Sequence, residues 1–407
     1  FFSNWIGGPS QKFGLPFVVL LRSSLGVKGA KYLGLLRTFV GIFMFGIQTY
    51  FLSKGFVYLI RVVIFSFEPS ILDNDIFLIF FLGLNILDWI SIILAIVIQV
   101  FLFSAGMIFN KKLIKFSAIT VYSGIIMCFL IVLLNDVKIS SASFVNSLEF
   151  QNIFDQKNLT PLFTVTGTVF AYFSIVILSF GDFTRYVKNK SELKKGNLSL
   201  FLNLIIFSFI SVLIVLGADT IFDKKLIAVE GLLTNPTDII GKLNNTFLTF
   251  IALLFILVAS ASTNLIANYV PIQNSLINFF PNKLTLKSAG FLIIFLGSLF
   301  AIFWETILSQ IGIISFIDTI GSFFGPIAGV VITDYYLIKN QNLINKDLFS
   351  SSVDGAYYFS SGWHLKAIYS LLIGFLFAAA TIWNYELRFL QSFSWIIGAF
   401  FSSLTYY

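Results

Sequence analysis

The chain has 407 residues, of which 57% are hydrophobic and only 11% are charged. An average soluble domain carries about 25% charged residues, so this composition excludes an ordinary soluble protein and indicates one embedded in a lipid bilayer. The net charge of +7 does not indicate nucleic-acid binding, because the positive side chains sort by membrane side.

Ten apolar segments approach or exceed the roughly 20 residues that a helix needs to cross a bilayer. In chain order, these expected spans cover residues 33–60, 84–109, 114–135, 161–181, 198–217, 246–270, 288–304, 308–337, 365–384 and 389–407. Their apolar runs are continuous and do not alternate with polar residues, which excludes a membrane β-barrel. We therefore expect residues 1–407 to form one all-α integral membrane domain.

Lysine and arginine are distributed unequally between the alternate loops of these spans. One set of loops contains 18 of the 26 and the other set contains 8. The richer set marks the cytoplasmic side, which places both ends of the chain there. The abundance of Phe, with 51 residues, and the excess of Lys over Arg suggest a bacterium with an AT-rich genome. We expect a multi-pass protein of the bacterial cytoplasmic (inner) membrane.

The sequence offers little catalytic chemistry. It contains one cysteine, Cys128, and one histidine, His364. It has no phosphate-binding loop, no dinucleotide-binding glycine pattern and no Cys/His cluster with metal-ligand spacing. We therefore expect neither an enzyme nor a resident cofactor.

The most polar stretch inside an apolar span runs from Ala259 to Asn264 and is followed by Asn268. Polar side chains are costly in hydrocarbon, so such a cluster normally faces a bundle interior or a water-filled path. On a helix, Ala259, Ser262 and Thr263 share one face, where a carbonyl and two hydroxyls could converge on a cation that prefers oxygen ligands. The alternative is close packing of small residues between helices.

A carboxylate, Asp318, lies inside the apolar segment 308–337. An ionisable residue within the membrane indicates function, and its candidate roles here are proton coupling or gating. The alternative is a polar residue at the start of a helix near the external surface.

Several sequence blocks give the chain a family resemblance. In chain order they are Gly14-Leu-Pro16 continuing to Gly29, Phe45-Gly-Ile-Gln-Thr49, Gly181-Asp-Phe-Thr-Arg-Tyr186, Ser262-Thr-Asn264 and Gly325-Pro326 continuing to Leu337. In this order and spacing they resemble the nucleobase–cation symporter family of cytosine, uracil, allantoin and hydantoin permeases. The resemblance covers nearly the whole chain. It implies twelve helices, the first ten forming two inverted five-helix repeats as in the leucine-transporter fold.

In that family the Gly14-Leu-Pro16 block lies just after the second span. The resemblance therefore implies that the first span and most of the second are missing upstream of Phe1, leaving about ten of twelve spans. In transporters of this architecture, substrate and ion lie between discontinuous helices at the midplane. We expect residues 161–181 to form one such helix, interrupted at Gly167 and Ala171.

The resemblance also implies a cation site. It pairs carbonyl groups of the missing first span with Ala259, Ser262 and Thr263, and this oxygen chemistry favours Na⁺ because no carboxylate is offered to a proton. A proton coupled through Asp318 is the alternative coupling ion.

For the substrate, Gln48 and Asn268 match the family's glutamine and asparagine. A carboxamide presents a donor and an acceptor side by side, which suits the N–H and C=O edges of a nucleobase or ureide. Met44 and Phe173 stand where members commonly carry Trp, so we expect weaker stacking or a smaller, less planar ligand. For Gln48 the alternative is an interhelical hydrogen bond.

Together these features predict a monomeric secondary transporter that imports a small ring with a cation by alternating access. Two alternatives stay open: the same fold carrying another solute, such as an amino acid, or a membrane sensor or binding protein that does not transport.

Overall fold

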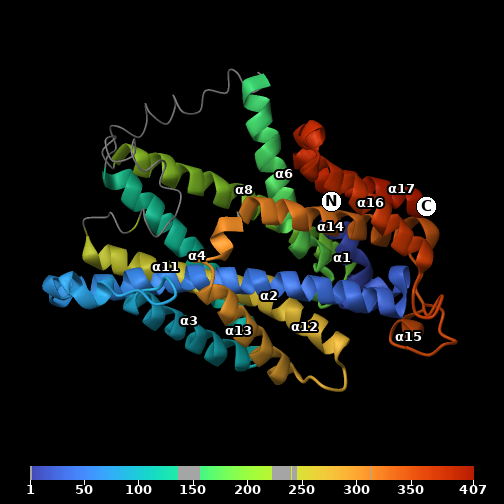
Figure 1. Cartoon of the computed structure of the whole chain (residues 1–407), viewed down its shortest axis with the longest axis horizontal. Helices are drawn as coiled ribbons and strands as arrows, with labels where there is room; N and C mark the ends of the chain where they lie inside the picture. The colour runs from blue at the N-terminus through green and yellow to red at the C-terminus, as the bar shows by residue number, and fades with distance from the viewer. Residues whose placement is uncertain (1, 136–155, 222–239, 241–244, 312) are drawn as a thin grey trace.

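The computed structural model describes residues 2–135, 156–221, 240, 245–311 and 313–407 (Figure 1). These residues are arranged almost entirely in helices and their connections. The longer α-helices are α1 (Phe2–Phe13), α2 (Phe17–Phe67), α3 (Ile86–Ser104), α4 (Met107–Asn135), α6 (Gln156–Leu178), α8 (Lys190–Ile221), α11 (Thr246–Thr263), α12 (Val270–Phe279), α13 (Leu286–Ile302), α14 (Ile313–Thr333), α16 (Leu365–Trp383) and α17 (Ser394–Tyr406). Shorter elements include α7 (Gly181–Thr184), α15 (Asn345–Leu348), the π-helical segments η4 (Asn264–Tyr269) and η6 (Asp334–Ile338), and the 3₁₀ segments η1 (Pro69–Asp73), η2 (Asp75–Leu78), η5 (Leu308–Ile311) and η7 (Tyr385–Phe393).

In the described part of the chain, eight helical segments are long and apolar enough to cross a membrane. The spans expected at 288–304 and 389–407 form shorter helices, α13 with 17 residues and α17 with 13. The expected span 389–407 is shorter because its first residues belong to the 3₁₀ segment η7. The predicted all-helical membrane architecture is therefore confirmed.

Helix α2 is 51 residues long and breaks at Gly26, whose φ is +81°. A side chain there would be strained by this left-handed backbone, and its Cβ would lie 2.6 Å from the carbonyl oxygen of Gly362. The break leaves backbone groups without helical partners. The turn before α16 satisfies them, since Lys28 N–H donates to the Gly362 carbonyl (2.8 Å) and His364 N–H donates to that of Leu25 (3.1 Å).

The helices pack in two groups. In the first, α2 lies along α3, α11, α12 and α13, and in the second α14 packs against α6, α16 and α17 (Figure 1). Small residues permit the close contact of α14 and α17. A Cβ on Gly325 would lie 2.3 Å from the Trp395 carbonyl oxygen, and one on Gly329 would lie 2.2 Å from that of Ala399. The spacing Gly325-x-x-x-Gly329 thus fixes this helix pair.

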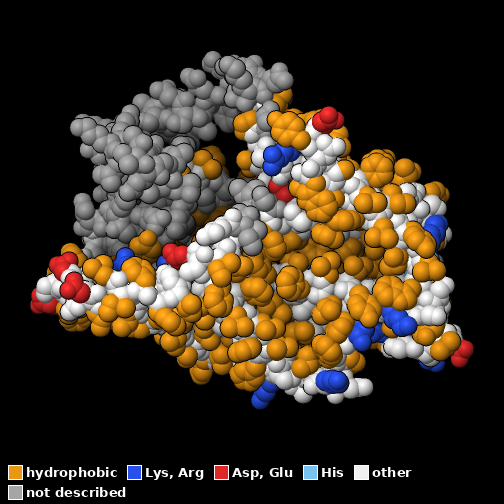
Figure 2. Space-filling view, viewed as in Figure 1, with side chains coloured by type: hydrophobic (Ala, Val, Ile, Leu, Met, Phe, Trp, Pro, Cys, Tyr) orange, Lys and Arg blue, Asp and Glu red, His pale blue; other side chains and the backbone are white. Residues whose placement is uncertain are grey.

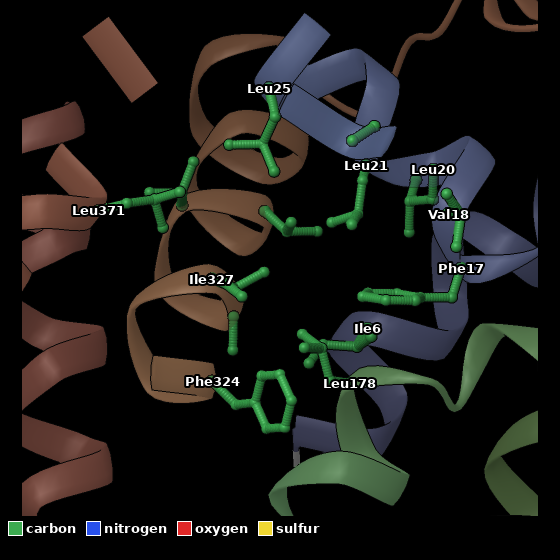
Figure 3. Close-up of a cluster of buried hydrophobic side chains, with 14 of the residues drawn as sticks. Ile6, Phe17, Val18, Leu20, Leu21, Leu25, Leu178, Phe324, Ile327 and Leu371 are labelled. Atoms are coloured by element: carbon green, nitrogen blue, oxygen red, sulfur yellow. The ribbon is translucent and has the colours of Figure 1, made fainter. Parts of the chain in front are cut away.

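The largest buried cluster lies where the two groups meet (Figure 3). Phe17, Leu21 and Leu25 from the start of α2 face Phe324 and Ile327 of α14. Outside this core, hydrophobic side chains cover much of the visible surface, and acidic side chains gather where α2 ends (Figure 2). Such an apolar exterior suits contact with lipid tails.

Candidate functional site

A π-helical segment, η4, joins α11 to α12 in the middle of one long helical rod. The sequence accounts for it through Pro271, because proline has no backbone N–H and crowds the carbonyl four residues earlier, that of Ala267. This carbonyl accepts a hydrogen bond from Arg37 Nη2 instead (3.2 Å). π turns of this kind occur frequently at functional sites, and this one carries Asn268.

Asn268 is the end of a buried chain of polar side chains. Its Nδ2 donates to Asn264 Oδ1 (2.9 Å), and Asn264 Nδ2 donates to the Phe45 carbonyl and to Thr49 Oγ1, both at 3.2 Å. Thr49 Oγ1 lies 3.2 Å from Gln99 Oε1 on α3. We call Asn268, Asn264, Thr49 and Gln99 the amide ladder. It ties η4, α2 and α3 together beside the predicted substrate residue.

Met44 and Gln48 lie one turn apart on α2, adjacent to this ladder, and both are half-buried. Met44 packs against a cluster that contains Phe43, Ile47 and Trp304. Among the described residues, none hydrogen-bonds the Gln48 carboxamide, so the alternative of an interhelical hydrogen bond gains no support there. The structure thus leaves the donor and acceptor of Gln48 available to a ligand.

Phe173 lies on α6 with 36% of its surface exposed. Its ring contacts that of Tyr172 at 5.3 Å between centroids, and no contact within the described residues joins it to Met44 or Asn268. The predicted break in this span is wrong, because α6 runs as one helix from Gln156 to Leu178. The small residues there serve packing instead: a Cβ on Gly167 would lie 2.2 Å from the Ser392 carbonyl oxygen.

The three predicted cation ligands lie together at the end of α11. Ser262 is buried and its Oγ donates to the Ala259 carbonyl at 3.0 Å, whereas Thr263 is exposed. Both oxygens of the Ser262–Ala259 pair keep lone pairs for a cation. In the described residues, no group of three or more His, Cys, Asp or Glu side chains could hold a metal ion. The candidate cation ligands at this place are therefore neutral oxygens.

Asp318 is buried in the second turn of α14 and accepts a hydrogen bond from Gln391 Nε2 of η7 at 2.6 Å. This contact links α14 to the segment between α16 and α17. No contact within the described residues joins Asp318 to Ser262 or Thr263.

A second buried polar group, around Arg37, was not predicted. Arg37 is fully buried on α2, and its Nε donates to Ser179 Oγ at 2.8 Å. Nearby, Asp182 of α7 accepts from the Phe17 backbone N–H (3.2 Å) and from Asn274 Nδ2 (3.3 Å). Burial raises the pKa of Asp182 to about 6, although the positive charge of Arg37 opposes that rise.

This second group joins α2, α7 and α12 on the predicted cytoplasmic side, in agreement with a structural role for Asp182. The sequence signal for this group was the charge of Arg37 inside an apolar segment, since ionisable residues in such segments usually pair with another polar group.

Asp334, in η6, centres a third polar group on the same side. It accepts from Ser24 Oγ (2.9 Å), Tyr406 Oη (2.8 Å) and Lys339 Nζ (2.6 Å). His364 Nδ1 lies 3.3 Å from the same Tyr406 hydroxyl. These contacts join the part of α2 just before the Gly26 break to η6, α17 and the start of α16, and this indicates a structural role for these residues.

Comparison with known proteins gives consistent matches. Residues 1–399 match the family described as permeases for cytosine/purines, uracil, thiamine and allantoin. A purine-uracil permease of Arabidopsis thaliana is 28% identical over 370 residues, which cover 90% of this chain and 59% of that protein. An allantoin permease of Bacillus subtilis is 25% identical over 406 residues, which cover 98% of this chain and 78% of that protein.

Two solved structures resemble this one along its whole length. Mhp1, a nucleobase-cation-symport-1 family transporter, in a closed conformation with bromovinylhydantoin bound, has a TM-score of 0.71, 18% identity and 81% of its chain covered. The inward-facing conformation of Mhp1 has a TM-score of 0.68, 18% identity and 80% covered. The likeness confirms the predicted leucine-transporter-like helix bundle.

Proposed function

Because the chain belongs to the family of permeases for cytosine/purines, uracil, thiamine and allantoin, we propose that it imports a nucleobase-like or ureide ring by alternating access. The observations that carry this proposal are the position of Asn268 on η4, where buried amides hold it, and the Gln48 carboxamide on α2, which no described residue hydrogen-bonds. Two carboxamides with available hydrogen-bonding atoms suit a planar ring that alternates N–H and C=O groups. Two permeases similar to it are named for purine-uracil and for allantoin, and uracil and allantoin are rings of this kind.

For the coupling ion we propose Na⁺, bound by the Ala259 carbonyl and the hydroxyls of Ser262 and Thr263. All three oxygens are neutral and lie on the last turn of α11. Carbonyl and hydroxyl oxygens at the end of a helix are the ligands that coordinate Na⁺ in transporters with unwound helices. Asp318 is the alternative route for a proton, and its hydrogen bond to Gln391 favours a role in closing the external end instead.

We further propose that the protein acts as a single transmembrane domain, as a monomer, in the bacterial inner membrane, with no resident cofactor. Met44 and Phe173 offer less surface for stacking than the Trp residues that family members commonly carry there, and would permit ligands less planar than a nucleobase.

Uptake into liposomes tests this function. The purified protein is reconstituted, and entry of radiolabelled uracil, cytosine, allantoin and hydantoin is followed with an inward Na⁺ gradient, with choline in its place, and with an inward proton gradient. We expect at least one ring to accumulate only under the Na⁺ gradient. Accumulation driven by protons and lost in Asp318→Asn would assign a proton symporter. Binding of rings without accumulation under any gradient would favour a sensor.

A further inference from the structure

The orientation of the amide ladder follows from one backbone group. The Phe45 carbonyl can only accept a hydrogen bond, and Asn264 reaches it at 3.2 Å. The Asn264 atom on that side must therefore be the nitrogen, which directs Oδ1 toward Asn268. Because Oδ1 can only accept, Asn268 must in turn present its Nδ2 at 2.9 Å.

Burial makes this arrangement costly to reverse. Asn264 and Thr49 are both fully buried, so neither can replace a lost partner with bulk water. Rotating the Asn264 amide would face its oxygen toward the Phe45 carbonyl oxygen. Thr49 could then bond that oxygen only by turning away the hydroxyl hydrogen that it donates to the Phe45 carbonyl at 2.8 Å. Thr49 is fixed from its other side, where Gln99 lies 3.2 Å away.

The locked Asn268 keeps a defined set of free atoms. One hydrogen of its amide is committed to Asn264, and no described residue donates to its Oδ1. Asn268 thus has its whole oxygen and one N–H left for a ligand. These two atoms complement a ring N–H that lies next to a carbonyl group.

We propose that Asn264 is a positioning residue that fixes the Asn268 carboxamide with its oxygen toward the ligand, and that this selects rings with an N–H beside a carbonyl. The proposal rests on the proposed function, because it concerns the same ring site. 1-Methyluracil carries such an N–H only at position 3, whereas 1-methylcytosine has a lone pair at that position on a ring of the same size; the methyl group removes the N1–H that both unmethylated bases carry beside a carbonyl. A site built to hydrogen-bond one group rejects the analogue that lacks it, because its buried polar atoms are left unpaired.

The test is equilibrium binding of 1-methyluracil and 1-methylcytosine to the purified protein in Na⁺, with the ratio of the two dissociation constants as the readout. We expect the protein to bind 1-methyluracil about tenfold or more tightly than 1-methylcytosine, which is the size of one lost hydrogen bond. Asn264→Leu keeps the side-chain size but frees the Asn268 amide to rotate. It should bring the ratio to within about threefold of one.

A damaged fold would weaken both ligands equally and leave the ratio unchanged, so the ratio separates positioning from general structure. If Asn264→Leu cannot be purified, Thr49→Val removes one of the two acceptors of Asn264 and should lower the ratio. Its matched control is Thr38→Val, since Thr38 is also buried on α2 but donates only to the Gly34 carbonyl at 2.8 Å. That control should leave the ratio unchanged.

Three results would overturn the proposal: equal or tighter binding of 1-methylcytosine by the unaltered protein, an unchanged ratio in Asn264→Leu, or an unchanged ratio in Thr49→Val where that variant stands in. In each case ring binding itself would stand, and with it the proposed function. Absence of binding by any ring would contradict the proposed function and the positioning role together.

Discussion

Replacing Arg37 with Gln should destabilise the protein through Asp182. The change removes the hydrogen bonds to Ser179 Oγ (2.8 Å) and to the Ala267 carbonyl (3.2 Å). It also removes the positive charge that opposes protonation of Asp182. Removing one partner of a buried ion pair costs up to about 3–5 kcal/mol; the cost here should be lower, because Asp182 keeps its hydrogen bonds from the Phe17 N–H and Asn274 Nδ2.

The pH dependence identifies this cause. Burial already places the pKa of Asp182, at about 6, above its ordinary value of 3.8, and loss of Arg37 should raise it further. A carboxyl whose pKa is higher in the folded state contributes stability at low pH and loses it as pH rises through the folded value. The destabilisation by Arg37→Gln should therefore be smaller near pH 5, where only the two lost hydrogen bonds count, than near pH 8.

The assay is thermal unfolding of the purified protein in detergent at pH 5, 6.5 and 8. Arg61→Gln is the matched control, because Arg61 is exposed on the same helix and should show no such trend. Adding Asp182→Asn to Arg37→Gln should recover most of the loss at pH 8, since no buried charge then remains. Equal destabilisation of Arg37→Gln at all three pH values, without recovery in the double variant, would refute the reasoning.

Three further predictions concern the proposed sites. Joint replacement of Ser262 and Thr263 by Ala should abolish Na⁺ stimulation of ring binding, and by reciprocity the ring should no longer tighten Na⁺ binding; unchanged Na⁺ dependence in titrations would move the site elsewhere. Met44→Trp should tighten planar bases several-fold through stacking of about 0.5–1.5 kcal/mol, with little gain for allantoin; an equal gain for all ligands would contradict a stacking role. Asp318→Asn should leave Na⁺-driven uptake in liposomes intact, whereas loss of a steep pH dependence would assign proton coupling to Asp318.

The sequence predicted the helices well, because length and continuous apolarity alone decide what can cross a bilayer. It also marked the residues around Asn268 as unusual, since a polar cluster inside an apolar span normally faces the interior of the helix bundle. Helix ends were harder. The span expected at 246–270 continues through η4 and α12 to Phe279, because Pro271 is accommodated by a π turn and does not end the helix.

The amide ladder could not be predicted as a unit, because Gln99, Thr49 and Asn264 lie on three separate elements whose register only the packed structure sets. Gln99 was visible as a carboxamide in the middle of the apolar span 84–109, yet its partner was not. The same holds for Arg37 and Asp182, which are 145 positions apart in the chain. The sequence can mark a single polar residue in an apolar span as unusual, but only the folded structure shows which other side chain it contacts.

Ring binding by the protein and by Asn268→Ala tests the central claim most directly. Calorimetric titration with uracil, allantoin and hydantoin in Na⁺ should give saturable binding of at least one ring, lost in Asn268→Ala and kept in Asn342→Ala, an exposed loop control. Binding that survives Asn268→Ala unchanged would contradict the placement of the site at the crossing of α2 and η4.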